Sequence, residues 1–183
     1  MPPKTASTRQ GYVSGEFLTR TFRISGEAPL RGELLLDQLN DLNALFITLE
    51  RMFISPLLDP AVLSGHFSAG EVRKDVLGLV VLNQQRDGLP AREGRYVGRD
   101  YTEHGVMLVV AGFEVRGVIT MHPTVNILHF VRTTPEQFIP IFNATATYAT
   151  QRDVVFQGGA ILVNRAWIEV FAMQAAAGNA KPA

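Results

Sequence analysis

Two stretches of the chain, 85 residues apart, have similar apolar patterns, and this internal similarity limits the possible folds more than any other feature of the sequence. Arg31-Gly32 falls on Arg116-Gly117, and Phe53-Ile54 falls on Phe138-Ile139, without a gap. The apolar positions that also coincide are Phe22 with Met107, Ile24 with Val109, Leu30 with Val115, Leu34 with Ile119, Leu36 with Met121, Leu42 with Ile127, Phe46 with Val131 and Leu57 with Phe142. Such self-similarity indicates that one supersecondary unit occurs twice. We therefore predict an internal duplication.

The first half predicts a β-rich unit with one helix. We expect a first strand over residues 18–24 and a second strand over 30–36, where the shared glycine marks a bulge or bend. Apolar residues at three- and four-residue steps predict a helix that Asp37 caps and that ends just before Phe53. Strands are then expected over 53–57 and 72–84, the second of these segments with a turn.

The second half predicts the same succession of elements with a shorter helix. We expect a strand over 115–121, a helix from 124 to 132, and strands over 138–148 and 154–173, the last with a turn. Thr133-Thr134-Pro135 ends the helix, because the residue before a proline avoids helical dihedral angles. The predicted fold is mainly β (α+β): two similar small barrel-like or bent-sheet units, each with one short helix. Free strand edges of such units favour pairing with each other or with another chain.

The domain organisation follows from the composition along the chain. We predict a flexible N-terminal tail over 1–14, a first β-rich repeat over 15–85, a linker over 86–100, a second repeat over 101–173 and a flexible C-terminal tail over 174–183. The linker is rich in glycine, proline and charge, and the C-terminal tail has few side chains that can pack.

The overall composition excludes several classes of function. The 17 Lys and Arg residues balance the 17 Asp and Glu residues, so nucleic acid is not the expected partner. The chain has no cysteine, which excludes disulfides, thiolate nucleophiles and Cys-based metal sites and is consistent with a cytoplasmic location. The first residues lack an apolar stretch of about 7–15 residues, so we do not expect them to be a secretory signal, and no apolar stretch approaches the roughly 20 residues of a membrane-spanning helix. We expect a soluble protein without membrane insertion.

Four short motifs of the chain resemble an uncharacterised bacterial family of small β domains. The motifs are Val115-Arg116-Gly117-Val118, Asn126-Ile127-Leu128, Phe138-Ile139-Pro140-Ile141 and Leu162-Val163-Asn164-Arg165. The first half departs from this pattern, with Ser55-Pro56 where Pro140-Ile141 stands and with Gln84 in place of Arg165. The resemblance implies a small β fold, present here as a tandem duplicate, and implies no activity.

A second group of residues resembles the signatures of the PilZ family, small barrels that bind cyclic diguanylate. Arg95 and Arg99 have the spacing of its paired arginines, and Asp100, Thr102 and Gly105 follow its second signature. The two signatures abut in this chain, whereas a stretch of strand separates them in the family, and a threonine replaces the serine. The resemblance implies a nucleotide site at Arg95, Arg99, Asp100 and Thr102, to which Arg116 could contribute. The alternative is a solvated linker, because nearby acidic residues balance the arginines.

Other candidate sites are weaker. The four histidines, His66, His104, His122 and His129, include no i, i+4 pair that predicts a zinc site. The sequence contains no Gly-x-Ser-x-Gly elbow, so we predict neither an enzyme nor a cofactor. We expect Arg165, Trp167 and Glu169 to share one face of the last strand, either as an interface anchor or as part of the core.

These observations favour a non-enzymatic protein-interaction or assembly module that binds a protein partner or associates with itself. The alternative is a small-barrel binding protein for a cyclic dinucleotide or RNA, which would use the arginines between Arg86 and Arg116.

Overall fold

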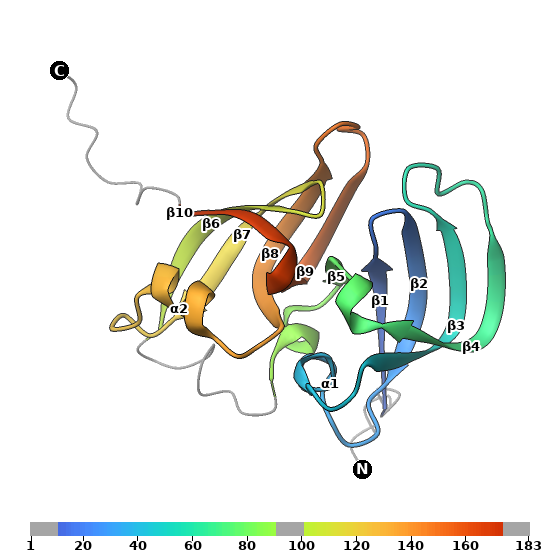
Figure 1. The fold of residues 1–183 in the computed structure, drawn as a ribbon, viewed down its shortest axis with the longest axis horizontal. Coiled ribbons are helices and arrows are strands. Elements are labelled where there is room, and N and C mark those ends of the chain that lie inside the picture. The colour runs from blue at the N-terminus through green and yellow to red at the C-terminus, as the bar shows by residue number, and fades with distance from the viewer. Residues whose placement is uncertain (1–10, 91–100, 174–183) are drawn as a thin grey trace, which may run out of the picture.

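An antiparallel sheet of ten strands dominates the computed structural model, which describes residues 11–90 and 101–173 (Figure 1). The strands are β1 (Tyr12–Leu18), β2 (Phe22–Pro29), β3 (Phe46–Pro56), β4 (Gly65–Arg73), β5 (Leu79–Leu82), β6 (Thr102–Val110), β7 (Phe113–Met121), β8 (Phe138–Tyr148), β9 (Val155–Asn164) and β10 (Ile168–Met173). The helices are α1 (Leu35–Asn40) and α2 (Ile127–Thr133), with short 3₁₀ segments η1 (Lys74–Val76), η2 (Gln85–Gly88) and η4 (Arg165–Trp167). The prediction of a mainly β protein with one short helix in each half is confirmed.

The sheet is open in the described part of the chain. Its strand order is β10-β6-β7-β8-β9-β5-β1-β2-β3-β4, so β4 and β10 each pair with one neighbour only. In Figure 1, β1–β4 and β6–β9 lie on opposite sides of the molecule, with β5 between them. Of the two expected forms, barrel-like or bent-sheet units, the barrel-like form is therefore not the one observed, because the sheet is not closed in the described chain. A strand has two edges, and β5 uses them for β1 and β9, so it has none left with which to close the first half onto β4.

The hydrophobic core runs through both halves and includes the strands where they meet. All four residues of β5 are buried, and so is the apolar run of β9 from Ala160 to Val163. A strand buried on both faces has a continuous apolar run rather than an alternating one, which is the pattern of both segments. One core therefore joins the two halves.

The second half of the chain agrees well with its sequence pattern. The strand expected over 115–121 lies within β7, and the strand expected over 138–148 is β8. Helix α2 lies at the expected place and ends at the threonine pair before Pro135. The segment expected over 154–173 forms β9, η4 and β10, with η4 as its turn.

The first half differs more from its prediction. The expected strand over 18–24 is a hairpin, in which the Thr19 hydroxyl accepts from the Phe22 amide at 2.9 Å. The expected strand over 30–36 is a turn followed by the start of α1, because Arg31 and Gly32 adopt positive φ angles of 39° and 89°. Strand β1 begins at Tyr12, inside the expected tail over 1–14. The division into domains is otherwise still a prediction.

The extent predicted for the helix of the first half, from Asp37 to just before Phe53, is also wrong. Helix α1 ends at Asn40, and Asp41 then accepts from the Asn43 amide at 2.9 Å in a local turn. Asp37 lies in the first turn and does not cap the helix, whose N-cap residue is Leu34. The chain forms β3 from Phe46 onwards, and in this strand Ile47 and Leu49 alternate with more exposed positions. Apolar spacing alone did not separate strand from helix here, and pairing with β2 and β4 favours the strand.

The anchors of the predicted repeat do not lie in equivalent elements. Arg31-Gly32 is in the turn before α1, whereas Arg116-Gly117 is in the middle of β7. Phe53-Ile54 is near the end of β3, whereas Phe138-Ile139 begins β8. The offset of 85 residues therefore does not relate the same elements.

Two glycines lie where the strand register shifts. Gly26 is at the irregularity between β2 and β3, and Gly117 is at the one between β7 and β8. A Cβ atom on Gly117 would lie 2.7 Å from the carbonyl oxygen of Phe142, closer than van der Waals contact allows. On Gly26 it would lie 3.4 Å from the carbonyl oxygen of Glu50. The bulge expected at Gly117 is confirmed.

Candidate functional site

The two halves of the sheet meet at a contact that we call the internal junction. It is formed by η1, β5 and α1 of the first half and by β8, β9 and η4 of the second. Strands β5 and β9 pair antiparallel over four residues, from Leu79 opposite Val163 to Leu82 opposite Ala160. Backbone pairing satisfies both strand edges, and the buried apolar side chains add the hydrophobic contribution. This junction shows how a strand edge of this fold recognises another.

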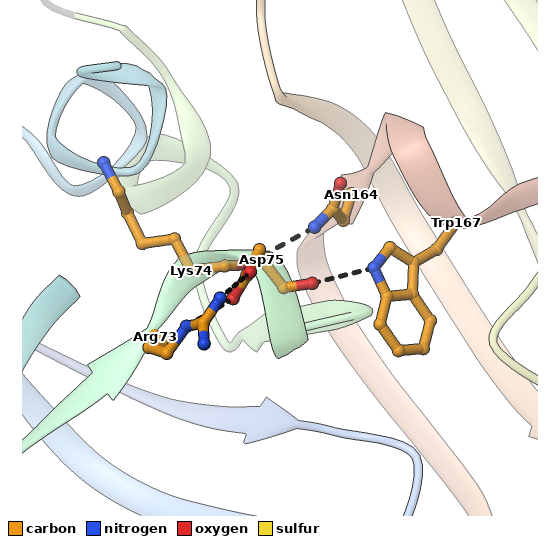
Figure 2. Close-up of polar contacts among 5 residues, drawn as sticks. All are labelled: Arg73, Lys74, Asp75, Asn164 and Trp167. Carbon is orange, nitrogen blue, oxygen red and sulfur yellow. Dashed lines mark hydrogen bonds and ion pairs between the residues drawn. The ribbon is translucent and has the colours of Figure 1, made fainter. Parts of the chain in front are cut away.

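Asn164 is the central polar residue of the internal junction (Figure 2). It is fully buried, and its side-chain amide donates to the carbonyl oxygens of Leu77 at 2.8 Å and Lys74 at 3.4 Å. Its side-chain oxygen accepts from the Ala166 amide at 3.1 Å, which caps η4. One side chain therefore starts η4 and binds the backbone of the other half.

Trp167 makes a second polar contact across the internal junction. Its indole N–H donates to the carbonyl oxygen of Asp75 at 2.9 Å (Figure 2). The guanidinium of Arg20 lies 4.3 Å from the centre of the indole ring, in the geometry of a cation–π contact. The tryptophan thus links η4 to both η1 and the β1–β2 turn.

Lys74 and Asn40 connect the junction to α1. The ammonium of Lys74, a buried residue, donates to the carbonyl oxygens of Gln38, at 3.0 Å, and of Asp41, at the C-terminal end of the helix. Burial lowers the pKa of Lys74, an effect that the nearby Asp41 partly offsets. Asn40 binds both backbone groups of Phe138, accepting from its amide at 2.7 Å and donating to its carbonyl at 3.1 Å. Helix α1 therefore lies against the start of β8.

The two ends of the sheet, β4 and β10, are its open edges. Most residues of β4 are exposed, as are four of the six residues of β10. Beside β4 lies an apolar groove of about 580 Å³, which we call the β4 groove. Its lining includes Phe22, Phe46, Val72 and Val76 from β2, β3, β4 and η1. Exposed strand edges next to apolar surface are typical of protein-binding sites.

The predicted interface residues do not share a strand face. Arg165 and Trp167 lie in η4, and only Glu169 lies in β10. The guanidinium of Arg165 donates to the carbonyl oxygen of Glu136 at 3.2 Å, whereas Trp167 contacts η1. The 3₁₀ turn breaks the two-residue alternation on which the prediction depended. Trp167 is an anchor within the chain, and Glu169 remains exposed.

Of the predicted ligand-binding residues, the structure describes Thr102 and Arg116, and it does not bring these two together. Arg95, Arg99 and Asp100 lie outside the described residues. Thr102 pairs with Met121 at the far end of β7 from Arg116, about 16 Å away at the usual rise of a strand. Arg116 lies 3.8 Å from the carboxylate of Glu114, which also binds Arg152. The nucleotide- or RNA-binding alternative stays a prediction.

Histidines of residues 11–90 and 101–173 make local contacts. His66 stacks on Phe53, with 4.4 Å between ring centres, and His122 shares a 2.8 Å hydrogen bond with Thr124. Within these ranges, no cluster of three or more His, Asp or Glu side chains has a geometry that could hold a metal ion. Neither described helix has the length and apolar character needed to cross a membrane.

Sequence reasoning missed the polar residues of the internal junction. Asn164 had one local signal, since an asparagine directly after an apolar strand often caps a turn or helix. Lys74 and Asn40 had none, because their partners are backbone groups that only the tertiary fold brings close.

Comparisons with models of protein families, with curated proteins and with solved structures found no match. The resemblances to a small-β-domain family and to PilZ proteins therefore stay expectations from the sequence.

Proposed function

We propose that this protein is a non-enzymatic interaction and assembly module that binds other protein chains through its open edges. The observation that carries the proposal is that β4 and β10, in the described chain, each have one paired edge and one exposed edge. An unpaired strand presents a row of N–H and C=O groups that another chain can complete. The internal junction between β5 and β9 is an example of such a contact within the chain itself.

We further propose that the two halves arose by internal duplication, in a register of 91 to 92 residues. Each half has its strands in the order fifth-first-second-third-fourth. With a shift of 91, Leu18 opposite Leu79 becomes Val109 opposite Val170, which is an observed pair. The other strand pairs follow in the same way, with a shift of 92 for β3 and 91 for β4.

Irregular features of the two halves support this register. The bulge glycines Gly26 and Gly117 are 91 residues apart. The residues on the neighbouring strands with positive φ are Arg51, at 49°, and Asn143, at 46°, and they are 92 apart. Bulges are specific features rather than general properties of strands, so their coincidence supports common descent more strongly than apolar alternation does.

Identical residues at this register also support the duplication. Phe22 at the start of β2 corresponds to Phe113 at the start of β7. Phe46-Ile47 at the start of β3 corresponds to Phe138-Ile139 at the start of β8. The last pair is the one that the offset of 85 had matched with Phe53-Ile54.

The charged groups on the described face of β1 and β2 favour a structural role. The Glu16 carboxylate accepts two hydrogen bonds from Arg23, each of 2.8 Å, and one from Ser25, of 2.6 Å. Nearby, Glu27 pairs with Arg51. These groups satisfy one another's hydrogen bonds, and this agrees with a structural role.

The experiment that tests the proposal blocks one open edge. The Lys74 amide donates to Leu45, on the side of β3, so alternation along β4 directs the Glu71 amide away from β3. Glu71→Pro therefore removes an outward donor and leaves the β3–β4 ladder intact. A protein that co-purifies with the chain is to be purified and titrated against Glu71→Pro and against the control Glu71→Ala. We expect at least tenfold weaker binding to Glu71→Pro than to Glu71→Ala, which loses the same carboxylate but keeps the backbone donor. Equal binding, or a monomer that binds no purified protein, would overturn the proposal.

A further inference from the structure

We propose that the chain assembles with copies of itself, head to tail, by pairing β10 of one copy with β4 of the next. In this pairing, β10 takes the place of β5 and β4 takes the place of β9, and the residues pair in the same register as in the internal junction. This inference rests on the proposed function and names its partner as a second copy of this chain.

The strand order makes the two open edges complementary. The internal junction pairs the fifth strand of the first half, β5, with the fourth strand of the second half, β9. The strands at the open edges are the fourth strand of the first half, β4, and the fifth of the second, β10. Two copies therefore offer each other the same kind of pair that each already contains. In the corresponding register, Val170 lies opposite Val72 and Ala172 lies opposite Gly70.

The β4 side has exposed apolar residues whose counterparts in the second half are buried. Phe46 is 47% exposed, whereas its counterpart Phe138, whose backbone Asn40 holds, is fully buried. Phe22 is 43% exposed, whereas Phe113 is fully buried, in part against aromatic rings of its own half. Both exposed phenylalanines line the β4 groove, so the groove lies where the internal junction has its core.

The β10 side shows the same difference. Val170 is 47% exposed, whereas its counterpart Leu79 in β5 is fully buried against β9. Leu128 in α2 is 45% exposed, whereas its counterpart Leu36 in α1 is buried. Helix α1 contacts β8 at the internal junction, so α2 is the element that would contact β3 of the next copy. Exposed apolar residues thus occur on both partners of the proposed contact.

One difference between the two junctions predicts that the contact between copies is the weaker one. Glu71 stands in β4 where the buried Leu162 stands in β9. Its carboxylate is exposed and accepts a 2.9 Å hydrogen bond from the Thr48 hydroxyl. Assembly has to desolvate part of this charge, which is unfavourable. A charge on an edge strand also limits uncontrolled aggregation. We therefore expect reversible, concentration-dependent assembly that Glu71→Leu strengthens.

The symmetry of the contact distinguishes it from other dimers. Two different surfaces meet, so each added copy again offers one β4 edge and one β10 edge. Such a heterologous contact forms a ring if the rotation between copies closes and a filament if it does not. A dimer that pairs β4 with β4, or β10 with β10, would stop at two copies.

The test uses two variants that each block one side. Phe46→Lys places a charge in the β4 groove, and Val170→Lys places one on β10; both side chains are half exposed, so both variants should fold. Val155→Lys is the control, because Val155 is 44% exposed and lies in the β8–β9 hairpin, outside both edges. Light scattering over a concentration series measures the mass, and circular dichroism checks the fold.

We expect the wild type and Val155→Lys to assemble and each edge variant alone to require at least tenfold higher concentration. An equimolar mixture of the two edge variants should form one-to-one dimers and nothing larger, because only one β10 edge and one β4 edge remain functional.

Two results would overturn the inference: a wild type that stays monomeric at several hundred micromolar, or edge variants that assemble as the wild type does. If the wild type stays monomeric but Glu71→Pro weakens binding of another purified protein, the proposed function stands and only the choice of partner is wrong. If both experiments are negative, both proposals fail.

Discussion

Replacement of Asn164 by alanine tests the internal junction most directly. The substitution removes two donors to the first half, at 2.8 and 3.4 Å, and one acceptor for the Ala166 amide at 3.1 Å. The site is fully buried, so the groups left behind do not regain these partners from solvent without rearrangement.

The magnitude follows from the three bonds. Loss of an N-cap costs about 1 kcal/mol. A buried carbonyl that loses its donor costs about 1–3 kcal/mol, and this applies fully to Leu77 and weakly to Lys74, whose bond is long. We therefore expect Asn164→Ala to lower the free energy of unfolding by about 3 kcal/mol in total. For a chain of this size, this corresponds to a fall in Tm of about 6–12 °C.

The assay is thermal and urea unfolding followed by circular dichroism and by the fluorescence of the single tryptophan, Trp167, which lies at the junction. The matched control is Asn126→Ala. Asn126 caps α2 through a 3.0 Å bond from the His129 amide, but it is exposed and makes no bond across the junction. The control should therefore lose about 1 kcal/mol. Equal losses for the two variants would refute the claim that Asn164 stabilises the contact between the halves.

Three further predictions concern single contacts. Gly117→Ala should destabilise the fold by about 1–3 kcal/mol and the equivalent Gly26→Ala by less than about 1 kcal/mol. Only the first substitution places a Cβ atom in steric conflict with a backbone carbonyl oxygen. Equal unfolding midpoints of the two variants in urea would contradict this prediction. Trp167→Phe loses the bond to the Asp75 carbonyl and should cost about 1 kcal/mol, and an unchanged Tm would show that the bond contributes nothing. Burial raises the pKa of Asp87, so the native state binds its proton more tightly than the unfolded state, and this contribution to stability is lost as pH rises above about 3.8. Asp87→Asn should therefore be more stable than the wild type at pH 7 and as stable as the wild type below about pH 3.8. A difference in the free energy of unfolding that does not change with pH would count against this prediction.

The elements that could be predicted have local causes. Helix α2 and strand β8 follow from the Thr-Thr-Pro stop and from a long apolar run, and both lie where expected. Helix α1 and strand β3 were not separated, because their apolar residues fit three- and four-residue steps as well as alternation. The partners of β3, strands β2 and β4, decide its conformation, and no local window of sequence contains both.

The offset of 85 residues failed for a related reason. It differs from 91 by six residues, which is three strand periods, so alternating apolar positions stay in phase at both offsets in the strands that follow the shift of 91. Apolar matches alone therefore cannot choose between them. The bulge at Gly26 and Gly117 does distinguish them, but a bulge becomes visible only when the partner strand is in place.

The candidate site was predicted least well. Free strand edges were expected in general terms, but which strands carry them was not. The arginines and Trp167 were predicted as site residues because their side chains are charged or aromatic. The contacts of Asn164, Lys74 and Asn40 are mostly to backbone atoms. A backbone partner cannot be identified from the sequence, because nearly every residue has the same backbone groups.

The sequence by itself determined that the chain forms a mainly β protein with two short helices, because apolar alternation, proline and glycine act through neighbouring residues. Only the tertiary structure decided that β5 pairs with β9, that the sheet stays open, and that β4 and β10 remain as its ends. Every strand offers the same backbone donors and acceptors, so the choice of partner depends on how apolar faces pack across distant parts of the chain. The internal similarity first suggested two units. Its main consequence for function is that these two units leave one edge of β4 and one edge of β10 unpaired in the described chain.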